Sequence, residues 1–338
     1  MNSTALSEQQ PPTPGKTLPV ATLLALTTVL PELFSGSTPL ISFLNPGLLL
    51  FLFLGYGLAI LLIRELAVRC RSGLLGLFFL GLAYSVFNEG LLAKTLIVEK
   101  NLPVGLYDHY GYLLGISFPW AAGIGAWHAC ASVIFPILLT HHFFPGAKEE
   151  PWLNGKIALI LGLLLMFLAC VAFLGISEKG VKGTPATLVV LLAIMFVGFL
   201  FGAVSKGKVL FCDSKLVTKP LLLGFSILIP FWGLGFLASA KAPVAIFFVV
   251  WLIVIQVYAW VLNRQHWLAL PSFLFFGLGW YLHNVVQAAV FVSIPGKDRA
   301  RALITTVVDG LILFLLFRQI RRGNRQRESD CRRDVVGL

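Results

Sequence analysis

Long apolar stretches recur along the whole chain, and they constrain its fold more than any other feature. Each is roughly 17 residues or longer, enough for an α-helix to cross a hydrocarbon core of about 30 Å. Helices satisfy their own backbone polar groups, as lipid requires. We therefore predict an all-α, polytopic transmembrane helix bundle with about ten spans. The predicted spans are 18–34, 47–63, 74–97, 119–144, 155–177, 185–205, 220–239, 243–262, 267–293 and 300–317.

The composition supports a membrane protein. Hydrophobic residues make up 58% of the chain and charged residues only 12%, whereas about a quarter of an average soluble protein is charged. The net charge of +11 could indicate nucleic-acid binding in a soluble domain, but here the basic residues lie in short loops and one tail. The expected partners are therefore the lipid bilayer and, at the basic tail, anionic lipid headgroups, and not nucleic acid.

The distribution of basic residues predicts the orientation. With both termini in the cytoplasm, most of the 26 Lys and Arg residues fall in cytoplasmic segments, as the positive-inside rule requires. Residues 1–17 are then a disordered cytoplasmic N-terminus, 18–317 the transmembrane helical domain and 318–338 a basic cytoplasmic tail. We expect a multi-pass protein of the plasma (inner) membrane. In an alternative interpretation, Leu18–Leu30 is the apolar region of a cleaved signal peptide, which leaves the orientation unchanged.

Four ionisable residues lie deep inside predicted spans, where a charged side chain costs about 2.5–3.5 kcal/mol. They are Glu89, His128, His283 and Asp309. Each lies roughly 12–15 Å below the outer end of its span at 1.5 Å per residue. This shared depth predicts one polar layer in the outer half of the bilayer. The alternative for each is a structural role, as a hydrogen-bonded core residue or as a link between helices.

Further polar residues near these four extend the predicted layer. They are Tyr84 and Asn88 in the third span, and Asn284 and Gln287 in the ninth. Tyr84 and Asn88 fall on the same helix face as Glu89, because residues one turn apart lie on one side of a helix. Arg64 and Glu65, by contrast, are predicted to form an interfacial ion pair at a helix end.

Three short motifs occur in an order that resembles the CAAX-protease and bacteriocin-processing intramembrane metalloprotease family. They are Asn88-Glu89, Trp127-His128 and His283-Asn284. The family carries a Glu-Glu pair, then Phe-x-x-x-His, then His-x-x-x-Asn. In this chain Asn88 stands in place of the first Glu, Ile124 in place of the Phe, and Gln287 in place of the last Asn.

The resemblance implies an intramembrane hydrolase. His128 and His283 would bind a metal, and Glu89 would act with them in catalysis as acid or base. The cofactor itself is unknown, and zinc is the candidate, because two histidines and a carboxylate can hold it and activate its bound water. The substrate, either a peptide or a lipid-linked molecule, is also unknown.

Two other classes of function are compatible with the same polar layer. The first is a proton- or ion-coupled transporter or permease, in which the layer is the ion site and Gly- and Pro-interrupted spans supply broken helices. The second is a non-catalytic membrane assembly protein, in which the polar groups only hold helices together. The chain has no ATP-binding motif, so a pump would need a gradient or a partner chain.

Overall fold

The computed structural model describes residues 15–35, 38, 40–99, 107–177, 181, 183–206, 228–264, 277–293 and 299–336. Within these ranges, the side chains of residues 228–231, 258–264, 280, 287, 290–293, 299, 301, 302 and 324–336 lie outside the description. All structural statements below refer to the described residues.

Nearly all described elements are helical, which confirms the all-α prediction. In chain order they are α1 (Thr17–Ser35), η1 (Leu40–Leu44), α2 (Pro46–Leu52), η2 (Phe53–Leu58), α3 (Ala59–Cys70), α4 (Leu74–Ser85), η3 (Val86–Leu92), β1 (Tyr112–Leu113), β2 (Ile116–Ser117), α5 (Phe118–Trp127), η5 (His128–Ile134), α6 (Phe135–Phe143), η6 (Pro145–Ala147), α7 (Gly155–Gly175), α8 (Pro185–Val204), α10 (Leu228–Ser239), α11 (Val244–Arg264), α13 (Gly279–Ser293) and α14 (Arg299–Val336). The strands β1 and β2 form a small antiparallel hairpin just before α5.

Seven described helices are long and apolar enough to cross a membrane. They are Thr17–Ser35, Pro46–Cys70, Leu74–Leu92, Phe118–Phe143, Gly155–Gly175, Pro185–Val204 and Leu303–Gly323. These correspond to the first six predicted spans and the last one. The predicted spans 220–239 and 267–293 fall partly on residues outside the description, and Val244–Val257 is a shorter apolar helix. A total of ten spans is therefore still a prediction.

Polar side chains mark where several apolar helices begin. The side-chain oxygens of Asn45, Ser117, Asn154 and Thr184 accept hydrogen bonds from backbone N–H groups in the first turns of α2, α5, α7 and α8. The first turn of a helix has backbone donors without intrahelical partners, and such caps satisfy them. The start of each helix therefore follows from its sequence.

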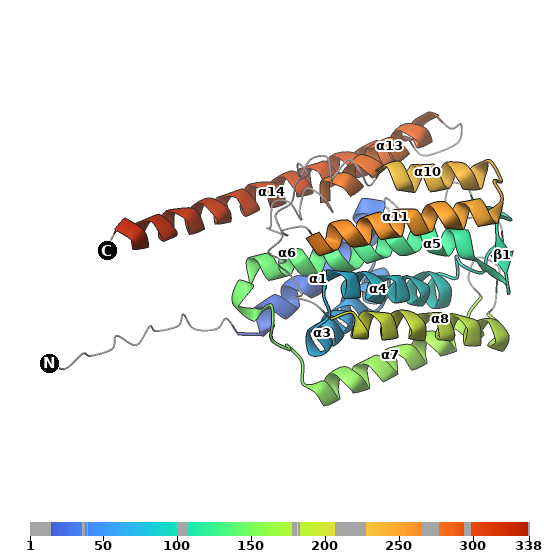
Figure 1. The fold of residues 1–338 in the computed structure, drawn as a ribbon, viewed down its shortest axis with the longest axis horizontal. Helices are drawn as coiled ribbons and strands as arrows, with labels where there is room; N and C mark the ends of the chain where they lie inside the picture. The colour runs from blue at the N-terminus through green and yellow to red at the C-terminus, as the bar shows by residue number, and fades with distance from the viewer. Residues whose placement is uncertain are drawn as a thin grey trace.

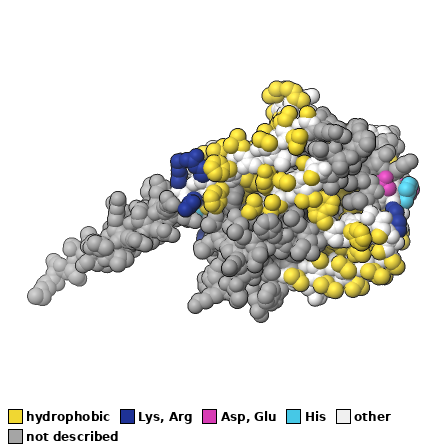
Figure 2. Space-filling model, turned by 90° about the horizontal axis from the view of Figure 1, so that it is seen from above, with side chains coloured by type: hydrophobic (Ala, Val, Ile, Leu, Met, Phe, Trp, Pro, Cys, Tyr) yellow, Lys and Arg dark blue, Asp and Glu magenta, His cyan; other side chains and the backbone are white. Residues whose placement is uncertain are grey.

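The spans differ in how deeply they are buried. In Phe118–Phe143 and Leu74–Leu92, 89% and 78% of the most apolar window is buried, against 11% in α7 and 17% in α8. The first two therefore form the centre of the bundle, and α7 and α8 lie along one side of it (Figure 1). Figure 2 shows hydrophobic side chains over much of the described part of one face, with Lys and Arg side chains near its two ends. This surface is suited to contact with lipid.

The central helices approach each other closely at a glycine. A Cβ atom added to Gly81 in α4 would lie 2.4 Å from the Cα atom of Ala129 in η5. Small residues at such crossings let two backbones approach, which is a common way of packing helices in a membrane.

We expect Gly81→Ala to lower the free energy of unfolding by about 1–3 kcal/mol, because the added methyl group forces α4 and η5 apart. The unfolding midpoint, followed by circular dichroism in a fixed detergent, measures this effect. Gly233→Ala in α10 is the matched control, since a Cβ there meets nothing within 4 Å. A loss of stability in the control equal to that of Gly81→Ala would contradict the packing argument.

The predicted disordered N-terminus and the predicted basic tail lie at the two ends of the chain. Residues 1–14, most of the predicted disordered segment, lie outside the description, and α1 begins at Thr17. At the other end α14 continues without a break to Val336, so the predicted basic tail is helical up to that residue. Figure 1 shows this part of α14 extending away from the rest of the bundle.

Candidate functional site

Three consecutive spans each contain a π-helical turn. These turns are η2 in the second span, η3 in the third and η5 in the fourth. The π-helix is rare and is frequently found at functional sites. The hydroxyl of Tyr84, one residue before the last residue of α4, donates to the carbonyl oxygen of Gly55 in η2 at 3.0 Å. The turns therefore belong to neighbouring helices of one region.

Glu89 in η3 and His128 in η5 form a direct pair. Glu89 Oε1 lies 3.0 Å from His128 Nε2. The other ring nitrogen of His128, Nδ1, lies 3.0 Å from the hydroxyl oxygen of Ser132 in the same π turn. The side chain of His128 is 1% exposed and that of Glu89 is 12% exposed. A carboxylate, an imidazole and a hydroxyl thus form one hydrogen-bonded chain inside the bundle.

The second oxygen of Glu89 is also held in place. The hydroxyl of Thr95 donates a hydrogen bond to Glu89 Oε2. The indole N–H of Trp120 in turn donates to the Thr95 hydroxyl oxygen at 3.0 Å. Both carboxylate oxygens therefore have fixed partners, and the orientation of Glu89 toward His128 is set by residues of the third span, the loop after it and the fourth span.

Two tyrosines pack against the ring of His128. The Tyr84 ring meets it edge-on, with centroids 5.4 Å apart, and the Tyr56 ring lies 6.0 Å away. The Tyr56 hydroxyl donates to Glu32 at 2.7 Å, and the Thr38 hydroxyl donates to the other oxygen of Glu32 at 2.6 Å. A second carboxylate, on α1, therefore lies close to the first pair.

The remaining residues of the predicted layer lie mainly around α13 and α14. Asn284 donates from Nδ2 to Asp309 Oδ2 at 3.2 Å, and both side chains are buried. The ring of His283 packs against those of Trp127 at 6.1 Å and Trp232 at 5.5 Å. Asn88 is buried beside Glu89, and Gln287 lies on α13 with its side chain outside the description.

Among the residues of the predicted layer, Glu89 contacts His128 and Asn284 contacts Asp309. His283 is in ring contact with Trp127, the neighbour of His128 in the chain. The catalytic and metal-binding roles of these residues stay predictions.

The described residues do not favour the zinc site implied by the metalloprotease resemblance. Among them, no group of three or more His, Cys, Asp and Glu side chains could hold a metal ion. Both ring nitrogens of His128 lie at hydrogen-bonding distance from protein groups, so binding a metal would displace one of them. No step proposed below therefore uses a metal.

A second polar network is centred on the middle of α3, where Arg64 and Glu65 are each 1% exposed and form an ion pair at 2.9 Å. The guanidinium of Arg64 donates to the backbone carbonyls of three residues of the connection between α6 and α7, namely Ala147, Lys148 and Glu150. It lies over the ring of Trp152 at 3.5 Å. The predicted ion pair is present, but it is buried by this connection.

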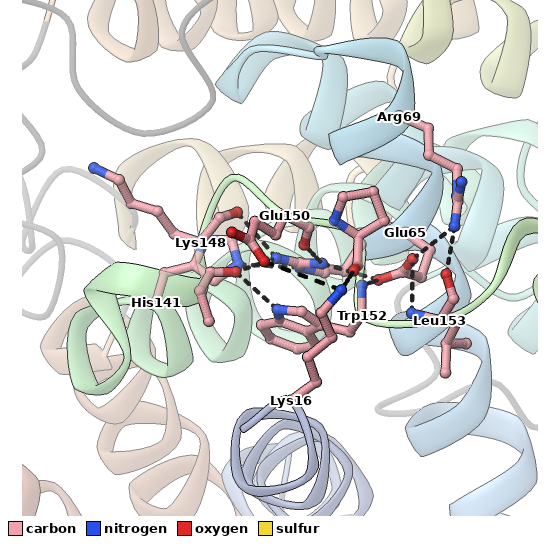
Figure 3. A network of polar contacts seen from close by, with 11 residues as sticks. Lys16, Glu65, Arg69, His141, Lys148, Glu150, Trp152 and Leu153 are labelled. Atoms are coloured by element: carbon pink, nitrogen blue, oxygen red, sulfur yellow. Dashed lines mark hydrogen bonds and ion pairs between the residues drawn. The ribbon is translucent and has the colours of Figure 1, made fainter. Parts of the chain in front are cut away.

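Glu65 holds the same connection from its other side. Its carboxylate accepts from the backbone N–H groups of Trp152 at 2.8 Å and Leu153 at 3.2 Å. Figure 3 shows these bonds together with the contact from Arg69 to Glu65. The network therefore fixes the connection between α6 and α7 against the end of α3.

Comparison with known families identifies the chain only at the level of a family. A family model described as an uncharacterized membrane protein family matches residues 21–318. The chain belongs to this family. The membership agrees with the multi-pass membrane fold, and it shows no link to the CAAX-protease group. No curated protein and no solved structure matches the chain.

Four site residues of this family member were not predicted from the sequence. They are Glu32, Tyr56, Thr95 and Ser132. Ser132 carried a usable signal, because it follows His128 by four residues and so lies on the same helix face. Glu32 lies near the end of the first predicted span, where an ionisable residue is not unusual. Tyr56 and Thr95 are neutral, and nothing in the sequence distinguishes them from ordinary polar residues of a span.

Proposed function

We propose that the protein is an intramembrane hydrolase of acyl esters in lipid or lipid-linked substrates. Ser132 is the nucleophile, His128 the base and Glu89 the group that orients His128. The observation that supports this most is the chain of hydrogen bonds from Ser132 through His128 to Glu89, with both distances 3.0 Å. A nucleophile bonded to a base, with the base oriented by a third group, is the arrangement typical of nucleophilic catalysis.

The protonation states follow from the partners of His128. A carboxylate accepts hydrogen bonds, so Nε2 carries the proton and donates to Glu89, and Nδ1 is free of a proton and accepts from Ser132. In this tautomer the imidazole can take the Ser132 proton. Glu89 then stabilises the imidazolium that forms, as the carboxylate does in known hydrolytic triads.

The proposed reaction balances without a cofactor. The Ser132 oxygen attacks the ester carbonyl carbon while its proton moves to His128 Nδ1. The alcohol leaves with that proton, and the acyl group stays on Ser132. Water then attacks the acyl carbon, giving a proton to Nδ1 that returns to the Ser132 oxygen. One ester and one water become one acid and one alcohol.

The surroundings of the three residues favour a membrane substrate. Ser132 and His128 are buried in apolar helices, and Glu89 is the most exposed of the three. Low polarity strengthens the electrostatic interactions of such a site. An ester that partitions into the bilayer can approach from the side, whereas a water-soluble ester must cross the layer of headgroups.

The topology expected from the sequence places this site in the outer half of the bilayer. We propose ten spans with both termini in the cytoplasm of a plasma (inner) membrane protein, supported by the bias of Lys and Arg. The arginines of α14 from Arg318 onward then lie on the cytoplasmic side, where anionic headgroups attract them. Cysteine accessibility at residue 109 and at residue 322, on opposite faces of this topology, tests the orientation.

A long-chain alkyl fluorophosphonate tests the proposed nucleophile. The Ser132 oxygen should displace fluoride and form a phosphonate ester, which peptide mass spectrometry locates. Ser132→Ala should abolish labelling. Ser85→Ala should retain it, because the buried Ser85 hydroxyl has no hydrogen-bond partner among the described residues. A folded, monodisperse wild-type protein that is labelled at neither Ser132 nor any other residue would overturn the hydrolase.

A second candidate function, proton-coupled transport, is supported by Glu32. Its bonds to Tyr56 and Thr38 place a second carboxylate next to the Glu89–His128 pair, and chains of Asp, Glu and His are typical of proton relays in transporters. In proteoliposomes with an internal pH dye, this function predicts proton flux that both Glu32→Gln and Glu89→Gln abolish. Fluorophosphonate labelling without proton flux would support the hydrolase function and contradict the transport function.

A further inference from the structure

An apolar groove of about 550 Å³ opens on the side of the bundle between α3, α4, α7 and α8. Its walls include Leu62, Leu66, Leu163, Met166, Met195 and Phe199. Leu159 and Leu163 of α7 are 62% and 63% exposed, so this wall also faces the surroundings of the protein. The volume falls within the usual range of about 300–1,000 Å³ for small-molecule sites.

The polar lining residues lie at the two ends of this groove. Glu65 and Arg69, in the last two turns of α3, form one end, and Tyr84 forms part of the other with Phe87. Tyr84 lies about 15 Å along the helix from the start of α4, at 1.5 Å per residue. A molecule that fills the groove therefore has one end at a charged pair and a long apolar body.

Arg69 gives the first end a positive charge. The carboxylate of Glu65 is already paired with the buried Arg64 at 2.9 Å. The Nη2 atom of Arg69 donates to Glu65 and to the carbonyl of Leu153, and its side chain is 36% exposed. Its Nη1 and Nε groups have no hydrogen-bond partner among the described residues, and Nη1 lies beside Gly155 at the start of α7. These donors are available to an anion.

We propose that the groove binds an anionic membrane phospholipid, with its phosphate at Arg69 and one acyl chain along α3 and α7. The positive charge of Arg69 at the first end of the groove complements a phosphate, and the apolar walls suit an acyl chain. Basic pockets between transmembrane helices bind such headgroups in other proteins. The site does not depend on the proposed hydrolase, because the esters of a lipid held at Arg69 lie at the opposite end of the groove from Tyr84.

The acyl chain brings this lipid into contact with the candidate site. Tyr84 lines the groove and also packs edge-on against His128 at 5.4 Å. A chain that fills the groove therefore restricts the movement of the Tyr84 ring and, through it, of His128.

Lipid binding by the purified full-length chain tests this proposal. The probe is phosphatidylglycerol that carries a diazirine on one acyl chain, compared with the phosphatidylcholine of identical chains. Native mass spectrometry gives the affinity of each lipid, and peptide mapping gives the crosslinked residues. We expect preference for phosphatidylglycerol, with crosslinks on groove residues such as Met166 and Met195.

Two variants distinguish the contribution of the lipid headgroup to binding from that of the acyl chain. Arg69→Gln should weaken phosphatidylglycerol binding by about fivefold, from roughly 1 kcal/mol per basic residue near a phosphate, and leave phosphatidylcholine unchanged. Gly162→Leu places a side chain in the groove, where a Cβ at this position meets nothing within 4 Å, and should weaken both lipids. Arg321→Gln on α14 is the control for general attraction to anionic lipid.

The results that would overturn the proposal are equally specific. Crosslinks that map outside the groove, or a preference for phosphatidylglycerol that survives Arg69→Gln but not Arg321→Gln, would place anionic lipid at the basic tail instead. Equal binding of both lipids by wild-type protein would remove the role of Arg69. None of these outcomes bears on whether Ser132 reacts with a fluorophosphonate.

Discussion

Glu89→Gln is expected to slow the reaction of Ser132 with an alkyl fluorophosphonate by about 10³- to 10⁴-fold. An amide in place of the carboxylate in a hydrolytic triad lowers the rate by about 10⁴. Glutamine can still contact His128, but it carries no charge to stabilise the imidazolium. When its NH₂ group faces Nε2, the imidazole proton moves to Nδ1, where it prevents proton transfer from Ser132.

The second-order labelling rate constant, measured by quenching at increasing times, gives this effect directly. Glutamine has nearly the shape of glutamate, so the fold should be retained, and a circular dichroism melt checks that it is. The matched control is Glu99→Gln, because Glu99 has a side chain that is 66% exposed; it should react at the wild-type rate. A labelling rate within twofold of wild type in Glu89→Gln would remove Glu89 from the proposed mechanism.

Arg64→Met is expected to lower the free energy of unfolding by about 3–5 kcal/mol, the usual cost of removing one partner from a buried ion pair. The substitution leaves the Glu65 carboxylate buried without its cation. It also removes the donor from the carbonyls of Ala147, Lys148 and Glu150. An unpaired buried group of this kind costs more than the bond itself contributes.

Denaturation of purified protein in mixed detergent micelles measures the loss. Arg321→Met provides the control, since Arg321 is an exposed arginine on α14 and should change little. The double variant Arg64→Met with Glu65→Met should recover part of the stability, because it removes the uncompensated charge. Recovery stays partial, since Glu65 also accepts from two backbone N–H groups. A single variant as stable as wild type would show that the connection between α6 and α7 is held by other contacts.

The sequence predicted the helices better than their arrangement. Hydropathy reports which segments cross a bilayer, and each of the first six predicted spans overlaps a described helix. Two ends differ: the second helix continues to Cys70, where the predicted span ends at residue 63, and the third ends at Leu92, where the predicted span ends at residue 97. It also marks Glu89 and His128, because ionisable groups in apolar segments are costly and therefore conspicuous. Hydropathy does not report which helices are neighbours, so the sequence predicted a shared depth for these two residues and not the contact between them.

Other features depend on tertiary contacts that no local pattern records. Arg64 was predicted to lie at an interface, and it is buried because the loop before α7 folds over it. The predicted layer divides into two pairs, because α13 pairs with α14 through Asn284 and Asp309. The π turns were not predicted, since their sequences differ little from those of ordinary apolar helix.

The π turns have a consequence for how the bundle can change shape. A π turn holds one residue more than an α turn, so it is equivalent to a single-residue insertion in a helix whose ends are fixed. When such an insertion moves along the helix by one position, the residue that it passes turns by about 100° about the axis. The second, third and fourth spans can therefore exchange the side chains that face His128 without sliding relative to the bilayer.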